Sequence, residues 1–158
     1  MSAPNPYAPP QAALKDAPPA AGSAVKAVTL GLVADIGGTL AGAVVFMVIY
    51  GIVLGVSGAS AEEITAATDF TSTDSWQFYV TTLLGLAFSV LGGYVCARIA
   101  RRNEMQLGAV LAVLSAAIGV LLGGDQYQLG TLLSVTLASI GAVMVGARLG
   151  YAKNRGTK

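Results

Sequence analysis

Four long apolar segments dominate the pattern of hydrophobic and polar positions along this chain of 158 residues. They lie at about 28–56, 77–101, 105–123 and 128–149. A helix needs about 20 residues to cross a hydrocarbon core of about 30 Å, so each segment is long enough to span a bilayer. Because two connections are very short, the pattern predicts an all-α integral membrane protein, an antiparallel four-helix transmembrane bundle over residues 23–151.

Small polar residues mark the expected helix starts. Ser23 is a candidate N-cap of the first helix, and Ser60 followed by Glu63 predicts a short capped helix over about 61–68. Gly37 and Gly38 offer the first helix a place to bend. The three later spans are each preceded by Asp or Asn with Gln three residues on, which predicts the same side-chain cap at each start: Asp74 with Gln77, Asn103 with Gln106, and Asp125 with Gln128.

The two ends of the chain differ from the spans in composition. Residues 1–22 are rich in Pro and Ala and lack an apolar run, which predicts a disordered cytoplasmic tail and no cleavable signal peptide. Residues 152–158 form a short basic tail. One transmembrane domain over 23–151 therefore accounts for nearly all of the chain.

The basic residues all fall on one predicted side of the four spans, and the two connections on the other side are acidic. Lys and Arg in short loops set the orientation of a membrane protein, with the basic side in the cytoplasm. We therefore expect both termini in the cytoplasm (N-in/C-in) and a location in the bacterial cytoplasmic (inner) membrane. The basic residues are Lys15, Lys26, Arg98, Arg101, Arg102, Arg148, Lys153, Arg155 and Lys158, and the acids opposite are Glu62, Glu63, Asp69, Asp74 and Asp125.

Composition argues against several other classes of protein. The chain is 54% hydrophobic and only 11% charged, whereas soluble domains are about 25% charged. No basic cluster is interleaved with aromatic residues, so no nucleic-acid partner is expected. The chain has no His, and Cys96 is its single cysteine. No catalytic residue, metal site or cofactor is therefore expected, and the lipid bilayer is the partner implied directly.

Small residues recur at every fourth position in the second and fourth spans. Such rows share one helix face and let two backbones approach closely in lipid. We expect them to pack the helices of one subunit, with self-association or docking on a larger membrane protein as the alternative. The rows are Gly85, Ser89, Gly93 and Ala97, and Gly130, Ser134, Ala138, Ala142 and Gly146.

A weak internal repeat relates the same two spans. Residues 81–100 align without a gap with residues 131–150, and Ser89/Ser139 is among the six identical pairs. The repeat predicts two tandem helical hairpins of the same orientation.

Asp35 is the only acidic residue within an apolar segment. An ionisable group at membrane depth is costly and is a functional candidate by default. The position of Asp35 early in the first span places it toward the cytoplasmic side, where a charge costs less. We expect an ion pair with Arg98 or Arg148, which close the inner ends of the second and fourth spans.

Two functions follow from these features. The first is an interaction or accessory component that packs through its Gly/Ala/Ser ridges, which is the function that the sequence favours. The alternative is a small proton- or cation-coupled transporter or channel that uses Asp35 and acts as a homo-oligomer. A paired acid in a dry bundle favours the first function, and a buried acid without an arginine partner, facing a polar cavity, favours the second.

Two resemblances accompany this interpretation. The stretches "NPYAPPQA", "GLVADIGGTLAG" and "GGYVCARIARRNEMQLGAVLAVL" resemble uncharacterised small bacterial four-span inner-membrane proteins, which implies a location and an architecture and no activity. Four spans with one acid in the first also resemble the small multidrug-resistance type of proton-coupled exporter. In that family aromatic residues flank a glutamate, whereas Asp35 has Gly37, Gly38 and Thr39 beside it and no aromatic residue before Phe46.

Overall fold

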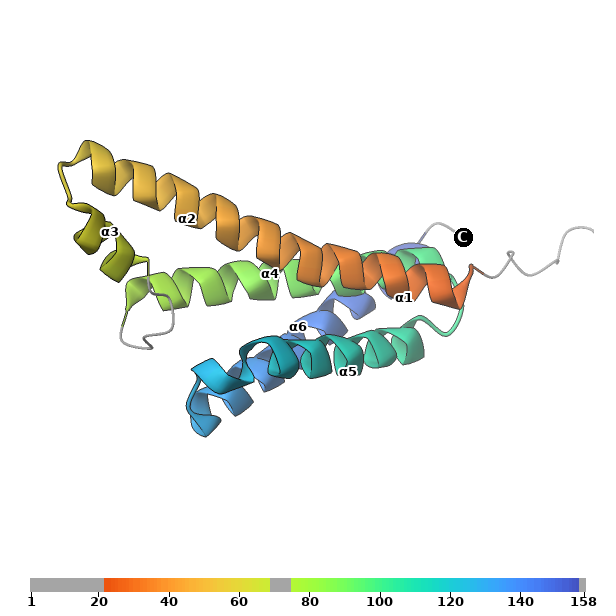
Figure 1. Cartoon of the computed structure of the whole chain (residues 1–158). Helices are drawn as coiled ribbons and strands as arrows, with labels where there is room; N and C mark the ends of the chain where they lie inside the picture. Colours follow the sequence, from red (N-terminus) through yellow and green to blue (C-terminus); the bar gives the residue numbers. More distant parts are fainter. Residues whose placement is uncertain (1–21, 69–74, 157–158) are drawn as a thin grey trace, which may run out of the picture.

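The chain is all-helical over residues 22–68 and 75–156, the part that the computed structural model describes (Figure 1). Most of it is organised in four long helices, as the hydrophobic pattern predicts. The elements are α1 (Ala24–Leu32), a π-helical segment (Val33–Gly37), α2 (Gly38–Val56), α3 (Ala61–Ala67), α4 (Trp76–Ala100), α5 (Glu104–Gly123), a 3-10 turn (Gly124–Gln126) and α6 (Leu129–Arg155). Residues 1–21 of the N-terminal tail expected from the sequence lie outside the described residues, as do the last two of the C-terminal tail.

Four helices are long and apolar enough to cross a membrane: Ala24–Val56, Trp76–Ala100, Glu104–Gln126 and Leu129–Arg155. The first combines α1, the π-helical segment and α2 in one continuous helix of 33 residues. The start of α1, the end of α4, the start of α5 and the end of α6 lie at one end of the molecule, called here the termini end (Figure 1). The opposite end, which carries α3 and the 3-10 turn, is the loop end.

The helix caps agree with the sequence in two cases and differ in three. The Ser23 hydroxyl caps α1, and Ser60 with Glu63 forms the expected capping box at α3. The cap of α4 is Ser75, and the side chains of Asn103 and Gln128 at the starts of α5 and α6 make no cap hydrogen bond. The side-chain cap predicted at the starts of the three later spans, an Asp or Asn with Gln three residues on, is therefore wrong. The backbone of Asn103 has a left-handed conformation, and a 3-10 turn containing Asp125 precedes α6.

The contact between α4 and α6 is the most extensive in the fold, and glycines make it possible. A Cβ atom on Gly93 would lie 2.0 Å from the carbonyl oxygen of Val143, and one on Gly146 would lie 1.9 Å from that of Val90. Any larger residue would force these backbones apart, because real Cβ atoms do not approach so closely. The two helices run in the same direction past this crossing, so repeat partners such as Ser89 and Ser139 face each other.

The tightly packed core lies in the half of the molecule toward the termini end. It is formed by small and medium side chains from α1, α4, α5 and α6, whereas no residue of α2 is buried. Toward the loop end, α2 and α4 separate from α5 and α6 (Figure 1). There α2 remains tied to α4, because the Gln77 amide donates to the Tyr50 hydroxyl at 3.2 Å and the Tyr50 ring meets Trp76 edge-on. The core residues are Ala27, Cys96, Ala100, Leu111, Ala112 and Val143.

The predicted rows of small residues are buried or half-buried toward the termini end and exposed toward the loop end. Ser89, Gly93, Ala97 and Gly146 are buried between helices, and Gly85 and Ala142 are half-buried. Gly130, Ser134 and Ala138 are exposed, so they do not pack the helices of one subunit as expected. The reason is that α4 and α6 cross at Gly93 and Gly146 and diverge from there toward the loop end (Figure 1).

Candidate functional site

Asp35 lies at the centre of the irregular π-helical segment Val33–Gly37 and is only 3% exposed. Glycines bring this segment against α4: a Cβ atom on Gly92 would lie 2.7 Å from both Asp35 Cβ and the Gly31 carbonyl oxygen. The Thr39 hydroxyl donates to the Asp35 carbonyl at 2.7 Å and so binds the backbone within the irregular turn. Single π-turns within α-helices occur frequently at functional sites.

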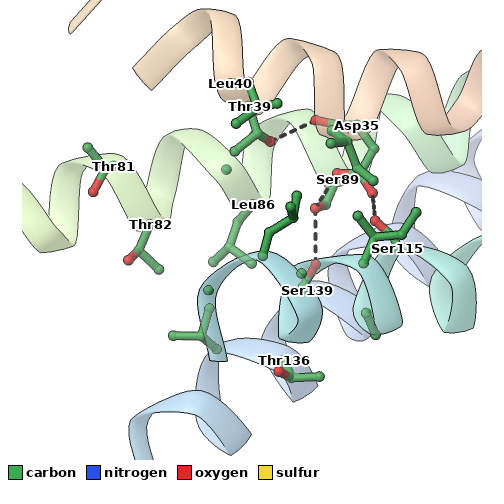
Figure 2. A pocket seen from close by; sticks show the side chains of 18 of the residues that line it. Asp35, Thr39, Leu40, Thr81, Thr82, Leu86, Ser89, Ser115, Thr136 and Ser139 are labelled. Atoms are coloured by element: carbon green, nitrogen blue, oxygen red, sulfur yellow. Dashed lines mark hydrogen bonds between the residues drawn. The ribbon is translucent and has the colours of Figure 1, made fainter. Parts of the chain in front are cut away.

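Serine hydroxyls from two other helices bind the carboxylate of Asp35 (Figure 2). Ser89 of α4 donates to Asp35 Oδ1 at 2.8 Å, and Ser115 of α5 donates to Oδ2. Ser139 of α6 shares a hydrogen bond of 3.2 Å with Ser89. All four long helices therefore contribute one side chain each to what we call the Asp35 cluster: Asp35, Ser89, Ser115 and Ser139.

The ion pair expected from the sequence is not formed among the described residues. The polar partners of the Asp35 carboxylate there are hydroxyls. Arg98 instead donates to Asn154 Oδ1 at 2.9 Å at the termini end, and Asn154 donates to the Ala97 carbonyl at 2.9 Å. Arg148 lies on the exposed surface of α6, in a shallow depression beside Glu104 and Tyr151. Arg98 and Arg148 belong to the rim of the bundle, and Asp35 belongs to its interior.

Asp35 also lies deeper than its place in the sequence indicated. It is one third of the way along its own helix, but its partners Ser89, Ser115 and Ser139 come from the central parts of α4, α5 and α6. The first helix extends beyond the other three at the loop end (Figure 1). Asp35, in the first third of this helix, is therefore level with the middle of the other three. A carboxylate at the termini end could have been solvated by water, whereas one at this level depends on its protein partners.

A cavity of about 410 Å³ extends from the Asp35 cluster toward the loop end. It occupies the space where α2 and α4 separate from α5 and α6, and its rim includes Leu40 and Leu122, whose side chains are 56% and 65% exposed. The cavity therefore reaches the surface between α2 and α5. Hydroxyl groups from Thr39, Thr81, Thr82, Ser89, Ser115, Tyr127, Thr136 and Ser139 line it together with apolar side chains (Figure 2).

The chemistry available to this site is that of one carboxylate and several hydroxyls. Such oxygen atoms accept hydrogen bonds and bind protons or hard cations. Groups of three or more His, Cys, Asp or Glu side chains that could hold a metal ion do not occur in the described ranges. Asp35 is the one carboxylate in the cavity lining, so the site matches a single positive charge.

Sequence reasoning singled out Asp35 and Ser89 but not the cluster that they form. Ser115 is not among the residues that the sequence singles out, and Ser139 enters only as the partner of Ser89 in the internal repeat. A usable signal existed for Ser139, because the repeat aligns it with Ser89 and α4 packs beside α6. No comparable pattern marks Ser115, whose role depends on where α5 sits.

No family model, curated protein or solved structure matches this chain. Its function therefore has to be inferred from the chemistry of the Asp35 cluster and of the cavity.

Proposed function

We propose that this chain is a multi-pass protein of the bacterial cytoplasmic membrane, an antiparallel four-helix bundle with both termini in the cytoplasm. Four helices of sufficient length and apolar character support membrane insertion. The orientation is supported by the Lys and Arg residues of the described ranges, which gather at the termini end, and by Glu62, Glu63 and Asp125, which lie toward the loop end. No catalytic residue, cofactor or nucleic-acid partner is assigned to it.

Within this bundle Asp35 binds and releases a proton or a small cation, and the protein is a small transporter or channel. The observation that carries this proposal is the burial of Asp35, with serines as its partners, at the inner end of a cavity lined by apolar side chains and by residues that bear hydroxyl groups. Among the residues that the structure describes, this carboxylate is bound by neutral hydroxyls and has no basic partner. Such groups in membrane helices mark the pathways of protons and ions.

This conclusion reverses the order of the two functions that the sequence supported. A structural role for Asp35 required a basic partner, and its partners are serines instead. The core between Asp35 and the termini end contains small, closely packed side chains, whereas the other direction opens into the cavity. Asp35 is therefore accessible from the loop end in this conformation, and release toward the termini end requires α1 and α4 to separate.

Exchange of Asp35 for asparagine tests the proposal. The wild-type protein, reconstituted in liposomes, is expected to dissipate an imposed proton or sodium gradient, measured with a trapped pH-sensitive or sodium-sensitive dye. Asp35→Asn is expected to reduce this flux to the rate of empty liposomes, because the amide retains the shape of the side chain but cannot carry the charge. Asp125→Asn, in the exposed turn before α6, is the matched control and should retain the flux.

Folding of both variants is checked by circular dichroism and gel filtration, so that loss of structure is not read as loss of function. A correctly folded Asp35→Asn variant with the wild-type flux would overturn the proposal.

A second function, that of an accessory component, is favoured by one specific observation. The row Gly130, Ser134 and Ala138 on α6 is exposed, and a Cβ atom on Gly130 would meet no atom within 4 Å. Rows of this kind bring membrane helices into close contact. A second copy of the chain or a different membrane protein could occupy it.

Native mass spectrometry of the protein, extracted gently from its own membrane, distinguishes these occupants. We expect a homo-oligomer, because a transporter of four helices has little protein around its single cavity. Ala138→Leu should weaken that oligomer, since the larger side chain lies in the row, whereas Leu137→Ala on the adjacent exposed face should leave it unchanged. A stoichiometric companion protein in place of the homo-oligomer would favour the accessory function.

A further inference from the structure

The cavity carries its only carboxylate at one end, which constrains what can fill it. Among the described residues its lining contains no Lys, Arg or Glu, and apart from Asp35 the titratable side chain there is Tyr127. Tyr127 lies against Gly123 at the far end of α5, remote from Asp35 along the helix. An occupant that complements this lining has one positive charge at one end and an uncharged body.

The acceptors around Asp35 match a group that has N–H donors. A carboxylate offers about four lone-pair positions, and Ser89 and Ser115 use one on each oxygen. The hydroxyl oxygens of Ser89 and Ser139 add further acceptor positions beside it. A primary ammonium group has three N–H donors and can bind several of these oxygens at once.

Quaternary ammonium ions do not fit this end of the cavity equally well. They have no N–H group and are recognised by the faces of aromatic rings. The single aromatic side chain in the lining is Tyr127, at the other end. The Asp35 cluster therefore discriminates by hydrogen bonding and not by an aromatic cage.

The size and walls of the cavity indicate an organic body attached to the ammonium group. Its volume of about 410 Å³ falls in the range of small-molecule sites, about 300–1,000 Å³, whereas one water occupies about 30 Å³. A bare cation bound to Asp35 would leave most of this space unused. The walls beyond the cluster include Leu86, Ile118, Leu132 and Val135, which suit an apolar chain or ring.

We infer that the cavity binds an amphiphilic primary ammonium ion, with its nitrogen at the Asp35 cluster and its apolar body directed toward the loop end. This inference rests on the proposed function, in which Asp35 exchanges a proton or a small cation, and adds the class of organic cation that the same site would bind. The exposed rim at Leu40 and Leu122 lets such a molecule enter from the side, between α2 and α5.

Three probes of equal length test the inference on the purified protein in detergent at pH 7. They are 4-phenylbutylammonium, its N,N,N-trimethyl analogue and the neutral 4-phenylbutan-1-ol, and binding is measured by equilibrium dialysis. The primary ammonium is expected to bind at least about tenfold more tightly than either analogue, since neither analogue combines a positive charge with N–H donors for the Asp35 cluster. Asp35→Asn should remove this preference, and its residual binding measures partition into the micelle.

A pair of glycine variants tests whether the cavity itself is the site. Gly119 lines the cavity and Gly141 does not, and a Cβ atom on either would meet nothing within 4 Å. Gly119→Leu is expected to fill part of the cavity and weaken binding of 4-phenylbutylammonium about tenfold or more, without touching Asp35. Gly141→Leu, on the exposed surface of α6, should bind it as the wild type does.

The outcomes separate this inference from the proposed function. Equal binding of all three probes, or wild-type affinity in Gly119→Leu, overturns the inference even if Asp35-dependent proton or sodium flux is present. Selective, Asp35-dependent binding without any flux upholds the ligand site and overturns transport. Absence of both selective binding and flux overturns both proposals.

Discussion

Gly146→Ala is expected to destabilise the protein by about 1–3 kcal/mol, the usual cost of forcing extra volume into a packed contact. The added Cβ atom would lie 1.9 Å from the Val90 carbonyl oxygen, and a backbone atom cannot move aside as a flexible side chain can. The two helices must therefore separate at their closest point. This cost outweighs the gain of about 1 kcal/mol in helix propensity that replacing glycine by alanine otherwise brings.

Gly141→Ala is the matched control, because it lies on the same helix and its Cβ atom would meet nothing within 4 Å. It should be neutral or stabilise the protein by up to about 1 kcal/mol. Stability is measured by reversible unfolding of both variants in mixed micelles, followed by circular dichroism. Equal stability of the two variants would show that α4 and α6 do not meet at Gly146.

Separation of α4 and α6 at Gly146 would also change the Asp35 cluster. The Ser89–Ser139 hydrogen bond joins α4 and α6 less than two turns from the crossing, at 3.2 Å. A shift of α6 away from α4 would lengthen it and change the acceptors around Asp35. Gly146→Ala should therefore weaken function as well as stability, although Gly146 does not line the cavity.

Ser115→Ala is expected to destabilise the protein by about 1.5–3 kcal/mol, the usual contribution of a hydrogen bond to a charged group. Ser115 is the hydroxyl donor to Asp35 Oδ2, and both residues are buried. Alanine fits the space but leaves that carboxylate oxygen without its donor. Ser89→Ala should have a similar effect through Oδ1.

Ser134→Ala is the matched control for these variants, since its hydroxyl is exposed and donates to the Gly130 carbonyl in its own helix. It should change stability by less than about 0.5 kcal/mol. A double-mutant cycle then tests the charge: in the Asp35→Asn background, Ser115→Ala should cost clearly less than in the wild type. Equal costs in both backgrounds would mean that Ser115 does not support the carboxylate.

Together these variants distinguish the two halves of the molecule. The half toward the termini end is held by close backbone contacts of α4 with α1 and α6, and it tolerates no added volume at the glycines of these contacts, such as Gly92, Gly93 and Gly146. The half toward the loop end contains the cavity, exposed glycines and the unburied helix α2. Asp35 lies at the boundary between them, in a π-helical segment followed by Gly38, where a change in helix geometry would alter both access to the carboxylate and its partners.

The sequence by itself determined the four long helices, because a run of apolar residues of sufficient length is a local property that needs no partner. It also determined the caps at Ser23 and Ser60, where the hydroxyl and the N–H group that it accepts from are three residues apart. The caps expected at Asn103 and Asp125 failed because short turns set the backbone there, with a left-handed residue at Asn103 and a 3-10 turn at Asp125.

Only the tertiary structure decided what surrounds Asp35. The sequence offered Arg98 and Arg148 as partners, since a basic residue at the inner end of a span can approach an acid in the first span. The depth of Asp35 depends on how far the first helix extends beyond the others, and its partners depend on the α4–α6 crossing, which brings Ser89 beside Ser139. These are relations between residues 50 to 80 positions apart, set by helix packing, and no local pattern encodes them.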